Sequence, residues 1–398
     1  IVDGEPEYGI GQQVGEFVLH VPAVQVSSIG AGGGSIARLD AQGVLKCGPE
    51  SAGSNPGPAC YGRGGDRPTV TDAFVTCGFL GDSDLGYGSI RIDRSKAVAA
   101  IETLARPLGL SAEEAASSII DVAVSGMFAG MSKVFARQGV EPNSFTLLAF
   151  GGAGPMMACF LAREMGFRSV LIPPNPGILS AFGGLIAETK GDFVRTFYGT
   201  LDQQSVAAVA AVFADLESEA RSWIVRANAQ AEDIRVSYFA DMRYEGQAFE
   251  LETELAGEWV ETLDAAKMLD AFHACHRRQY GHADPAAPVQ AINLRVVISC
   301  RNPAPSSPLQ QMRRQPAEPR SWARVYFDGG LHRAGVYSRE DLSPGACFDG
   351  PAIIHQNDTT SCMLDGFRGH IDALGNLVME NVALLQAEGP APAGLATV

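Results

Sequence analysis

The sequence predicts an α/β protein, with a first region of alternating strands, glycine loops and helices and a second region richer in strands. Three observations carry this prediction. A glycine-rich run, residues 27–37, follows the apolar extended run 21–26. A second glycine loop, residues 150–155, follows the apolar run 145–149 and leads into a helical pattern. From about residue 200 the pattern changes to an amphipathic helix and then mostly to short apolar strands. Two glycine loops, each preceded by a strand, favour a nucleotide- or anion-handling enzyme.

The first glycine loop contains Gly32, Gly33, Gly34 and Ser35. Glycine lets backbone N–H groups approach an anion closely, so these four residues are candidates for binding phosphate or carboxylate oxygens. The following residues predict a strand, a tight turn at 40–43 and a second strand. A dinucleotide-binding loop must run into a helix, so this hairpin argues against one, although Glu50 lies at a suitable distance for a ribose contact. No Walker loop is present, because no Lys-Ser or Lys-Thr follows the glycines.

A long loop, residues 48–68, is dense in Gly, Pro, Ser and Asn, and a loop of this length is usually functional. Cys60 in this loop is either a nucleophile or, by the simpler interpretation, a packed thiol. The segment Thr69-Val70-Thr71-Asp72 follows. Asp72 is the candidate catalytic residue, as a Mg²⁺ ligand or general base. Its structural alternative is a helix N-cap.

A capping box, Ser111 to Glu114, predicts a long helix to about residue 138 that ends at Gly139. The second glycine loop then leads from a strand into a helix at 156–165. Gly151, Gly152 and Gly154 are therefore candidate cofactor-binding residues, because backbone donors at a helix N-terminus suit a phosphate or nucleotide. A plain tight turn is the alternative. A strand at 169–172 and a helix at 178–187 complete this region.

The second region is predicted to hold helices at 206–229 and 263–280 and strands at 234–238, 249–255, 292–299, 324–327, 352–356 and 361–364. The proline-rich segment 303–319 is predicted to be a linker or surface loop. The predicted boundaries are residues 1–195 for the first domain, 196–230 for a connecting helix, 231–385 for a strand-rich domain and 386–398 for a flexible tail.

His273, His276 and His282 have a spacing that weakly suggests a metal site, but core or surface histidines are the simpler interpretation. The role of His355 is equally ambiguous.

The composition limits the function classes. A formal charge of −15 on 398 residues argues against nucleic acid or an anionic membrane as partner. No uninterrupted apolar run approaches the ~20 residues of a membrane span, and the N-terminus has no signal-peptide pattern. The eight cysteines form no C-x-x-C pair and read as reduced thiols of a cytoplasmic protein. The chain has no initiator Met and reads as a fragment or processed subunit.

Longer motifs resemble the hydantoinase A / 5-oxoprolinase family, which includes N-methylhydantoinase and the ATP-binding subunits of acetone and acetophenone carboxylases. The matching motifs cover essentially the whole chain; they are residues 26–40, 48–65, 68–73, 149–155, 176–183, 243–247, 272–282 and 350–352. The resemblance implies an actin-like ATPase lobe, of the hexokinase and heat-shock-chaperone type, plus a C-terminal α+β domain. It further implies ATP and Mg²⁺ as cofactors, with residues 151–155 as the adenosine motif and residues 30–35 near phosphate or substrate.

In this family ATP activates a poorly electrophilic carbonyl by phosphorylation, either for ketone carboxylation or for cyclic amide ring opening. The N-terminal phosphate loops of the family do not occur here, so the chain resembles the C-terminal half to two-thirds of a member. Met157 and Phe74 stand where members often carry His and Asn. The expected partners are a hydantoinase B-like subunit and the missing N-terminal portion or a paralogue. The truncation favours a ketone carboxylase component; a catalytically silent structural subunit is the alternative.

Overall fold

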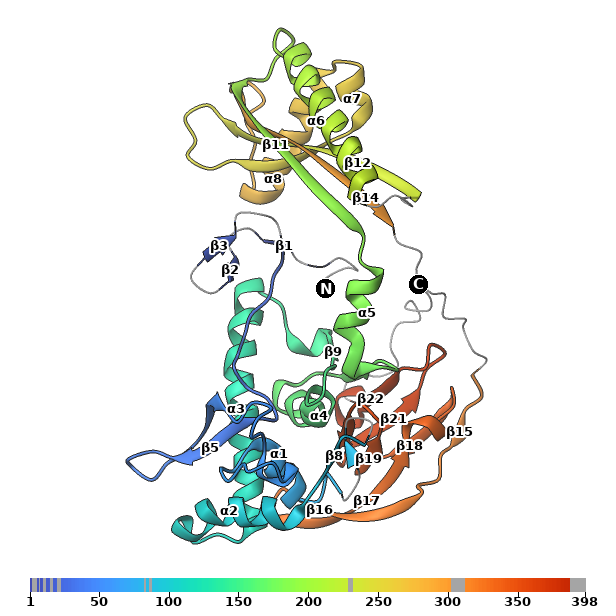
Figure 1. Cartoon of the computed structure of the whole chain (residues 1–398). Coiled ribbons are helices and arrows are strands. Elements are labelled where there is room, and N and C mark those ends of the chain that lie inside the picture. The colour runs from blue at the N-terminus through green and yellow to red at the C-terminus, as the bar shows by residue number, and fades with distance from the viewer. Residues whose placement is uncertain are drawn as a thin grey trace. The chain divides into compact units, whose positions relative to one another are not determined.

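The computed structural model describes residues 1, 6, 8–9, 12–14, 17–19, 23–81, 84–85, 88–227, 232–301 and 312–386. It divides into two compact units (Figure 1). Unit 1 comprises residues 1–180 together with 307–398, and unit 2 comprises residues 181–306. Each unit has its own hydrophobic core.

Unit 1 is built around a β-α-β segment that carries the second glycine loop. Strand β9 (Thr146–Leu148) lies parallel to β10 (Ser169–Ile172), and α4 (Gly154–Met165) connects them. Nine of the twelve residues of α4 are buried, so this helix lies in the core. Gly166 ends α4 in the left-handed conformation that glycine adopts without strain. The predicted strand–loop–helix–strand order is therefore present at nearly the predicted bounds.

The first glycine loop leads into a hairpin, as the sequence predicts. Strand β5 (Ser35–Leu39) pairs antiparallel with β6 (Leu45–Ser51) across the turn at 40–43. Asp40 stabilises this turn, because its carboxylate accepts hydrogen bonds from the amides of Gln42 and Val44. The loop does not run into a helix, so the argument against a dinucleotide-binding fold agrees with the structure.

Three helices follow the hairpin: α1 (Val70–Thr76), α2 (Arg94–Leu108) and α3 (Ala112–Gln138). Helix α3 begins at the predicted capping box of Ser111 and Glu114 and ends at Gly139 in the left-handed conformation. By length and composition α3 could cross a membrane, but its first half packs against α1 and α2. Core helices of water-soluble proteins pass the same test, so α3 is weak support for a membrane span.

The C-terminal part of the chain completes unit 1. Strand β22 (Leu377–Asn381) pairs antiparallel with β10, which gives the six-stranded order β15-β18-β21-β22-β10-β9. The other strands of this sheet are β15 (Gln315–Pro316), β18 (Ala346–Asp349) and β21 (Phe367–Ile371). Figure 1 shows these red and orange strands beside the green α4 and β9. A second sheet contains β16 (Ser321–Phe327), β17 (Gly330–Ser338), β19 (Ala352–His355) and β20 (Thr360–Met363).

The compact units therefore divide the chain differently from the predicted domains. Residues 307–386 were expected to belong with 231–306, but the pairing of β22 with β10 places them in unit 1. The segment 196–230 was expected to be a connecting helix, but α6 (Val206–Ala227) is part of the core of unit 2. Backbone pairing between residues about 200 positions apart leaves no local signal in the sequence, which is why the predicted boundaries differ.

Unit 2 is a four-stranded antiparallel sheet covered by helices. Its strands are β11 (Thr189–Thr200), β12 (Glu232–Tyr244), β13 (Leu251–Leu255) and β14 (Val289–Arg301). The last strand, β14, lies between β11 and β12, so the order is β11-β14-β12-β13. Helix α6 packs on β11 and β14, and α8 (Ala265–Tyr280) packs on β13. The mixed α/β architecture with several sheets agrees with an actin-like lobe plus a strand-rich region.

Candidate functional site

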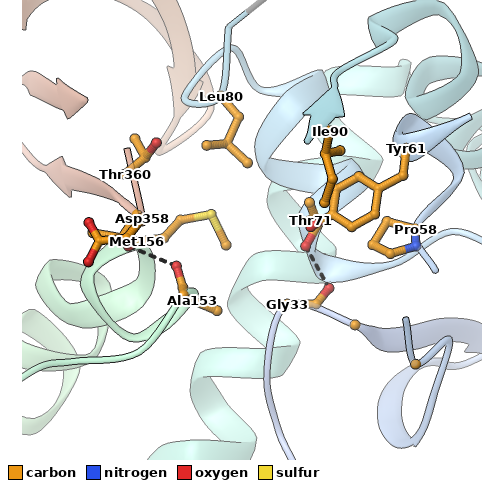
Figure 2. Close-up of a pocket in the computed structure, with 14 residues that line it drawn as sticks. Gly33, Pro58, Tyr61, Thr71, Leu80, Ile90, Ala153, Met156, Asp358 and Thr360 are labelled. Carbon is orange, nitrogen blue, oxygen red and sulfur yellow. Dashed lines mark hydrogen bonds between the residues drawn. The ribbon is translucent and has the colours of Figure 1, made fainter. Parts of the chain in front are cut away.

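The two glycine loops meet at one cavity in unit 1. Gly33 and Gly34 from the first loop and Gly152 and Ala153 from the second line a cavity of about 310 Å³. Figure 2 shows Gly33 with Thr71 and Tyr61 on one side of it and Ala153 with Thr360 on the other. The remaining lining residues are Gly53, Pro58, Leu80, Ile90, Met156, Asp358 and Thr359. Segments about 120 residues apart in the chain thus share one crevice.

The first loop is held in place by its carbonyl groups. The carbonyl oxygen of Gly33 accepts hydrogen bonds from the amide of Thr71 (2.8 Å) and from its hydroxyl (2.9 Å). The carbonyl oxygen of Gly34 accepts one from the amide of Ala52 (2.8 Å). A Cβ on Gly33 would lie 2.7 Å from the Thr71 hydroxyl oxygen, so this position has no room for a side chain. Within the described part of the chain, the amides of Gly33 and Gly34 have no acceptor.

Ser35 stabilises the loop itself. Its buried side chain accepts a hydrogen bond from the amide of Gly32 (3.0 Å), and its amide donates back to the Gly32 carbonyl (3.0 Å). The hydroxyl oxygen of Ser35 is therefore already engaged within the loop. Its predicted role in binding a ligand stays a prediction, and this geometry supports a role in shaping the loop.

The second loop forms the N-terminus of α4. Gly151 has a φ of +80°, and its amide donates to the carbonyl of Pro176 (2.8 Å). Ala153, the N-cap of α4, makes no side-chain capping hydrogen bond. The first amides of a helix lack partners within the helix and carry the positive end of its dipole. The loop therefore presents uncapped donors next to the cavity.

A second, apolar cavity of about 330 Å³ lies against the same loops. Gly32, Ala153 and Gly154 border it, together with apolar residues from the first loop, from β9 and the two residues after it, from α3 and from α4. Those residues are Ala31, Met127, Leu147, Leu148, Ala149, Phe150, Met157, Ala158 and Leu161. We call the first cavity the polar cavity, because hydroxyl and carboxylate side chains contribute to its lining, and Ala153 borders both cavities.

Asp72 is buried and does not line either cavity. Its carboxylate accepts four hydrogen bonds, from the amides of Ala59 (3.2 Å), Cys60 (2.8 Å) and Thr69 (2.9 Å) and from the Thr69 hydroxyl (2.7 Å). Asp72 is the third residue of α1 and forms a capping box with Thr69. The N-cap itself is therefore Thr69, three residues before Asp72. This geometry gives Asp72 a structural role. Direct contact with a substrate, as predicted for a catalytic residue, would require these bonds to break.

The other single residues that the sequence analysis named are buried or paired with other side chains. Cys60 is fully buried, and burial raises the pKa of its thiol, which fits the packed-thiol interpretation. Glu50 forms a two-fold ion pair with Arg67 on the surface. Phe74 belongs to a buried aromatic cluster with Phe79 and Phe160 and does not reach the cavities.

The histidines of unit 2 form hydrogen bonds within the protein. The Nδ1 atom of His273 lies 2.8 Å from the Tyr244 hydroxyl, which also accepts a hydrogen bond from the amide of Asp284. The Nε2 atom of His276 lies 3.1 Å from the side-chain amide of Gln247. Over the described residues no group of three or more His, Cys, Asp or Glu side chains is placed to hold a metal ion. His273 and His276 are buried and hydrogen-bonded within unit 2, as expected for core histidines.

Sequence reasoning missed several residues that line the polar cavity. Tyr61 and Thr71 lie close to the predicted glycines, and burial raises the pKa of the Tyr61 hydroxyl. Asp358 and Thr359 come from the turn between β19 and β20, Thr360 is the first residue of β20, and all three reach the loops only through the tertiary fold. The available signal was a polar run, residues 355–361, between the short apolar runs 352–354 and 362–364.

Asp358 is the one charged residue among the described residues that line the polar cavity. Its Oδ2 atom accepts a hydrogen bond from the amide of Gly177 (2.7 Å). Because no Lys or Arg of the described chain borders the cavity, an anion there would be bound by backbone amides, by hydroxyl groups and by any accompanying cation.

Comparison with known proteins gives the family. Residues 1–192 match the hydantoinase/oxoprolinase family, and residues 200–381 match the hydantoinase/oxoprolinase C-terminal domain. The chain belongs to the hydantoinase/oxoprolinase family. The resemblance inferred from the sequence motifs is confirmed.

Two curated relatives show the range of the family. The chain is 34% identical to the caprolactamase subunit alpha of Pseudomonas jessenii, over 89% of this chain and 52% of that protein. It is 27% identical to the acetone carboxylase beta subunit of Xanthobacter autotrophicus, over 94% of this chain and 54% of that protein. The chain thus spans about half the length of the curated relatives it matches.

A solved relative supports the fold. The nucleotide-free structure of an acetone carboxylase, described as catalysing ATP-dependent acetone carboxylation, matches with a TM-score of 0.83 and 26% sequence identity. The match covers 95% of this chain and 56% of that chain. The predicted α/β fold class is therefore confirmed.

Proposed function

We propose that this chain is a subunit or part of an ATP-dependent enzyme that activates a carbonyl substrate by phosphorylation. The observation that carries the proposal is the shared cavity of residues 33–34 and 152–153, in a family whose relatives include an ATP-dependent carboxylase and a caprolactamase. The substrate is a ketone or a cyclic amide. ATP, when bound, would supply the phosphoryl group that turns the oxygen of an amide or of an enol into a good leaving group.

The residues of this chain would bind and orient the reactants. The uncapped amides of the second loop and the N-terminus of α4 suit the nucleotide, with the apolar cavity beside Gly154 as a seat for its base. The amides of Gly33 and Gly34 suit phosphate oxygens or the charge that develops on the carbonyl oxygen. These donors are fixed before a ligand arrives, because hydrogen bonds to their neighbouring carbonyl groups hold the loops.

Mg²⁺ would accompany ATP at this site. Mg²⁺ is usually held by one or two carboxylates together with substrate phosphates, and keeps several waters. The described part of the chain supplies no cluster of three or more ligating side chains, which fits an ion carried mainly by the nucleotide. It would offset the phosphate charge in a cavity whose described lining has no Lys or Arg.

Curated relatives named as alpha and beta subunits support a place in a multi-subunit complex. We propose a hydantoinase B-like subunit as partner, together with a hydantoinase A portion that the present chain does not contain. The free cysteines and the use of ATP fit the cytoplasm.

Isothermal titration of the chain with ATP-Mg²⁺ tests the proposal. Saturable binding, followed by phosphate release that increases with caprolactam, hydantoin, 5-oxoproline or acetone plus bicarbonate, would support it and would identify the substrate class. The release assay is run with the proteins that co-purify with the chain. Failure to bind ATP-Mg²⁺ in that complex would contradict the proposal and point to a structural subunit.

A further inference from the structure

The turn between β19 and β20 holds two loops by hydrogen bonds: the second glycine loop, which precedes α4, and the loop at 174–178, which precedes α5 (Leu179–Ile186). The Thr359 hydroxyl donates a hydrogen bond to the Gly152 carbonyl (2.8 Å), across 207 positions of sequence. The side-chain amide of Gln356 donates to the Pro174 carbonyl, and Asp358 accepts from the amide of Gly177. The turn itself is closed by a hydrogen bond from the Gln356 amide to the Thr359 carbonyl (3.0 Å). We call residues 356–359 the clasp.

The two fastened loops are also bonded to each other. The amide of Gly151 donates to the carbonyl of Pro176 (2.8 Å), so the loop at 174–178 supports the glycine loop from one side and the clasp holds both. Contact between clasp and loop is close at Gly177, where an added Cβ would lie 2.7 Å from both Cβ and Oδ2 of Asp358. The clasp therefore leaves little freedom to the backbone at Gly151 and Gly152.

We propose that Thr359 is a positioning residue for the anion-binding amides of the proposed ATP site. The carbonyl oxygen and the amide hydrogen of a trans peptide point in opposite directions. A hydrogen bond that holds the Gly152 oxygen toward Thr359 therefore turns the Ala153 amide hydrogen away from Thr359. That amide has no acceptor among the described residues, and Ala153 borders both cavities. This inference rests on the proposed function of the loop as a nucleotide site.

The neighbouring residue provides a matched control. Thr360 is as buried as Thr359, since both side chains are 3% exposed, and it lines the same cavity. Its hydroxyl oxygen has no hydrogen-bond partner among the described residues. A hydroxyl group that makes no hydrogen bond does not orient the backbone of the loop. Replacing it with a methyl group of similar size is expected to leave the stability of the protein unchanged or to raise it.

The experiment compares Thr359→Val, Thr359→Ser and Thr360→Val in the 398-residue chain. Val keeps the size of the side chain but removes the hydroxyl, whereas Ser keeps the hydroxyl. We expect Thr359→Val to weaken ATP-Mg²⁺ binding by roughly fivefold to 100-fold, the effect of losing one oriented donor. Thr359→Ser should bind like the wild type, whereas Thr360→Val serves as the control in the exchange measurement without nucleotide. No weakening by Thr359→Val, or equal weakening by Thr359→Ser, would overturn the proposal.

A measurement without nucleotide separates this inference from the proposed function. Hydrogen–deuterium exchange of residues 149–156 reports the order of the loop in the free protein. We expect faster exchange there in Thr359→Val, wild-type exchange in Thr359→Ser and in Thr360→Val, and no change in unit 2. Unchanged exchange in Thr359→Val would overturn the positioning role. Faster exchange in Thr359→Val, together with a wild-type chain that binds no ATP, would retain that role and contradict only the assignment of the site to ATP.

Discussion

Replacing Asp72 with Asn tests whether this residue builds the site or reacts in it. The carboxylate serves three buried backbone amides and the Thr69 hydroxyl, and it has no exposed surface. Asn has almost the same shape but offers one acceptor oxygen and places an NH₂ group where the other oxygen was. Whichever way the amide is turned, at least one backbone donor then faces a donor inside the protein.

The expected loss of stability follows from these bonds. An unsatisfied buried donor costs about 1–3 kcal/mol, and the weakened capping box adds about 1 kcal/mol, so Asp72→Asn should lose roughly 2–4 kcal/mol. Such a loss is a large part of the ~5–15 kcal/mol by which domains are stable. The matched control is Asp93→Asn at the N-cap of α2. That carboxylate is exposed and accepts from the amides of Ser95 and Lys96, and Asn caps a helix as well as Asp does.

Hydrogen–deuterium exchange of residues 59–76 in increasing urea measures this loss within unit 1. We expect the exchange midpoint to fall for Asp72→Asn and to stay near the wild-type value for Asp93→Asn. Nucleotide binding by the folded fraction should be retained. A stability within about 0.5 kcal/mol of the wild type, combined with complete loss of turnover, would refute the structural role and restore the catalytic one.

Three further predictions concern other parts of the molecule. Gly152→Ala should weaken ATP-Mg²⁺ binding, because Gly152 lines the polar cavity. It should not lower the thermal stability, because a Cβ there meets no atom within 4 Å. Gly183→Ala, at an equally open position, is the control, and a melting temperature lowered by Gly152→Ala would contradict the reasoning. Unit 2 should lose stability as the pH falls below about 6.5, since burial lowers the pKa of His273 and the unfolded chain then binds the proton more readily. Urea unfolding, followed by the fluorescence of Trp223 and Trp259 in a Trp322→Phe background, should show this pH dependence. The variant His273→Gln should reduce it. Cys60 should react with a thiol reagent only after unfolding, because it is fully enclosed and its thiol pKa is raised, whereas the partly exposed Cys275 and Cys347 should react in the native protein. Rapid native labelling of Cys60, located by mass spectrometry, would contradict the packed-thiol interpretation.

The sequence by itself determined the local elements and the family. The hairpin at 35–51, the capped helix at 112–138 and the β-α-β segment at 146–172 follow from turn residues, capping boxes and apolar periodicity, which act over a few neighbouring positions. The long glycine motifs were specific enough to identify the hydantoinase/oxoprolinase family. They also named Gly32, Gly33, Gly34, Gly152 and Gly154, which line the two cavities. Of these, Gly33 has no room for a side chain beside the Thr71 hydroxyl.

Only the tertiary structure decided which residues surround those glycines. The return of residues 312–386 to unit 1 depends on β22 pairing with β10, and this pairing brings Thr359 to Gly152. The burial of Asp72 and its four hydrogen bonds likewise appear only in the tertiary structure, whereas its sequence context allowed a catalytic residue beside the simpler helix cap. Contacts between distant segments depend on the packing of whole sheets, and that packing leaves no pattern in the neighbouring residues from which it could be predicted.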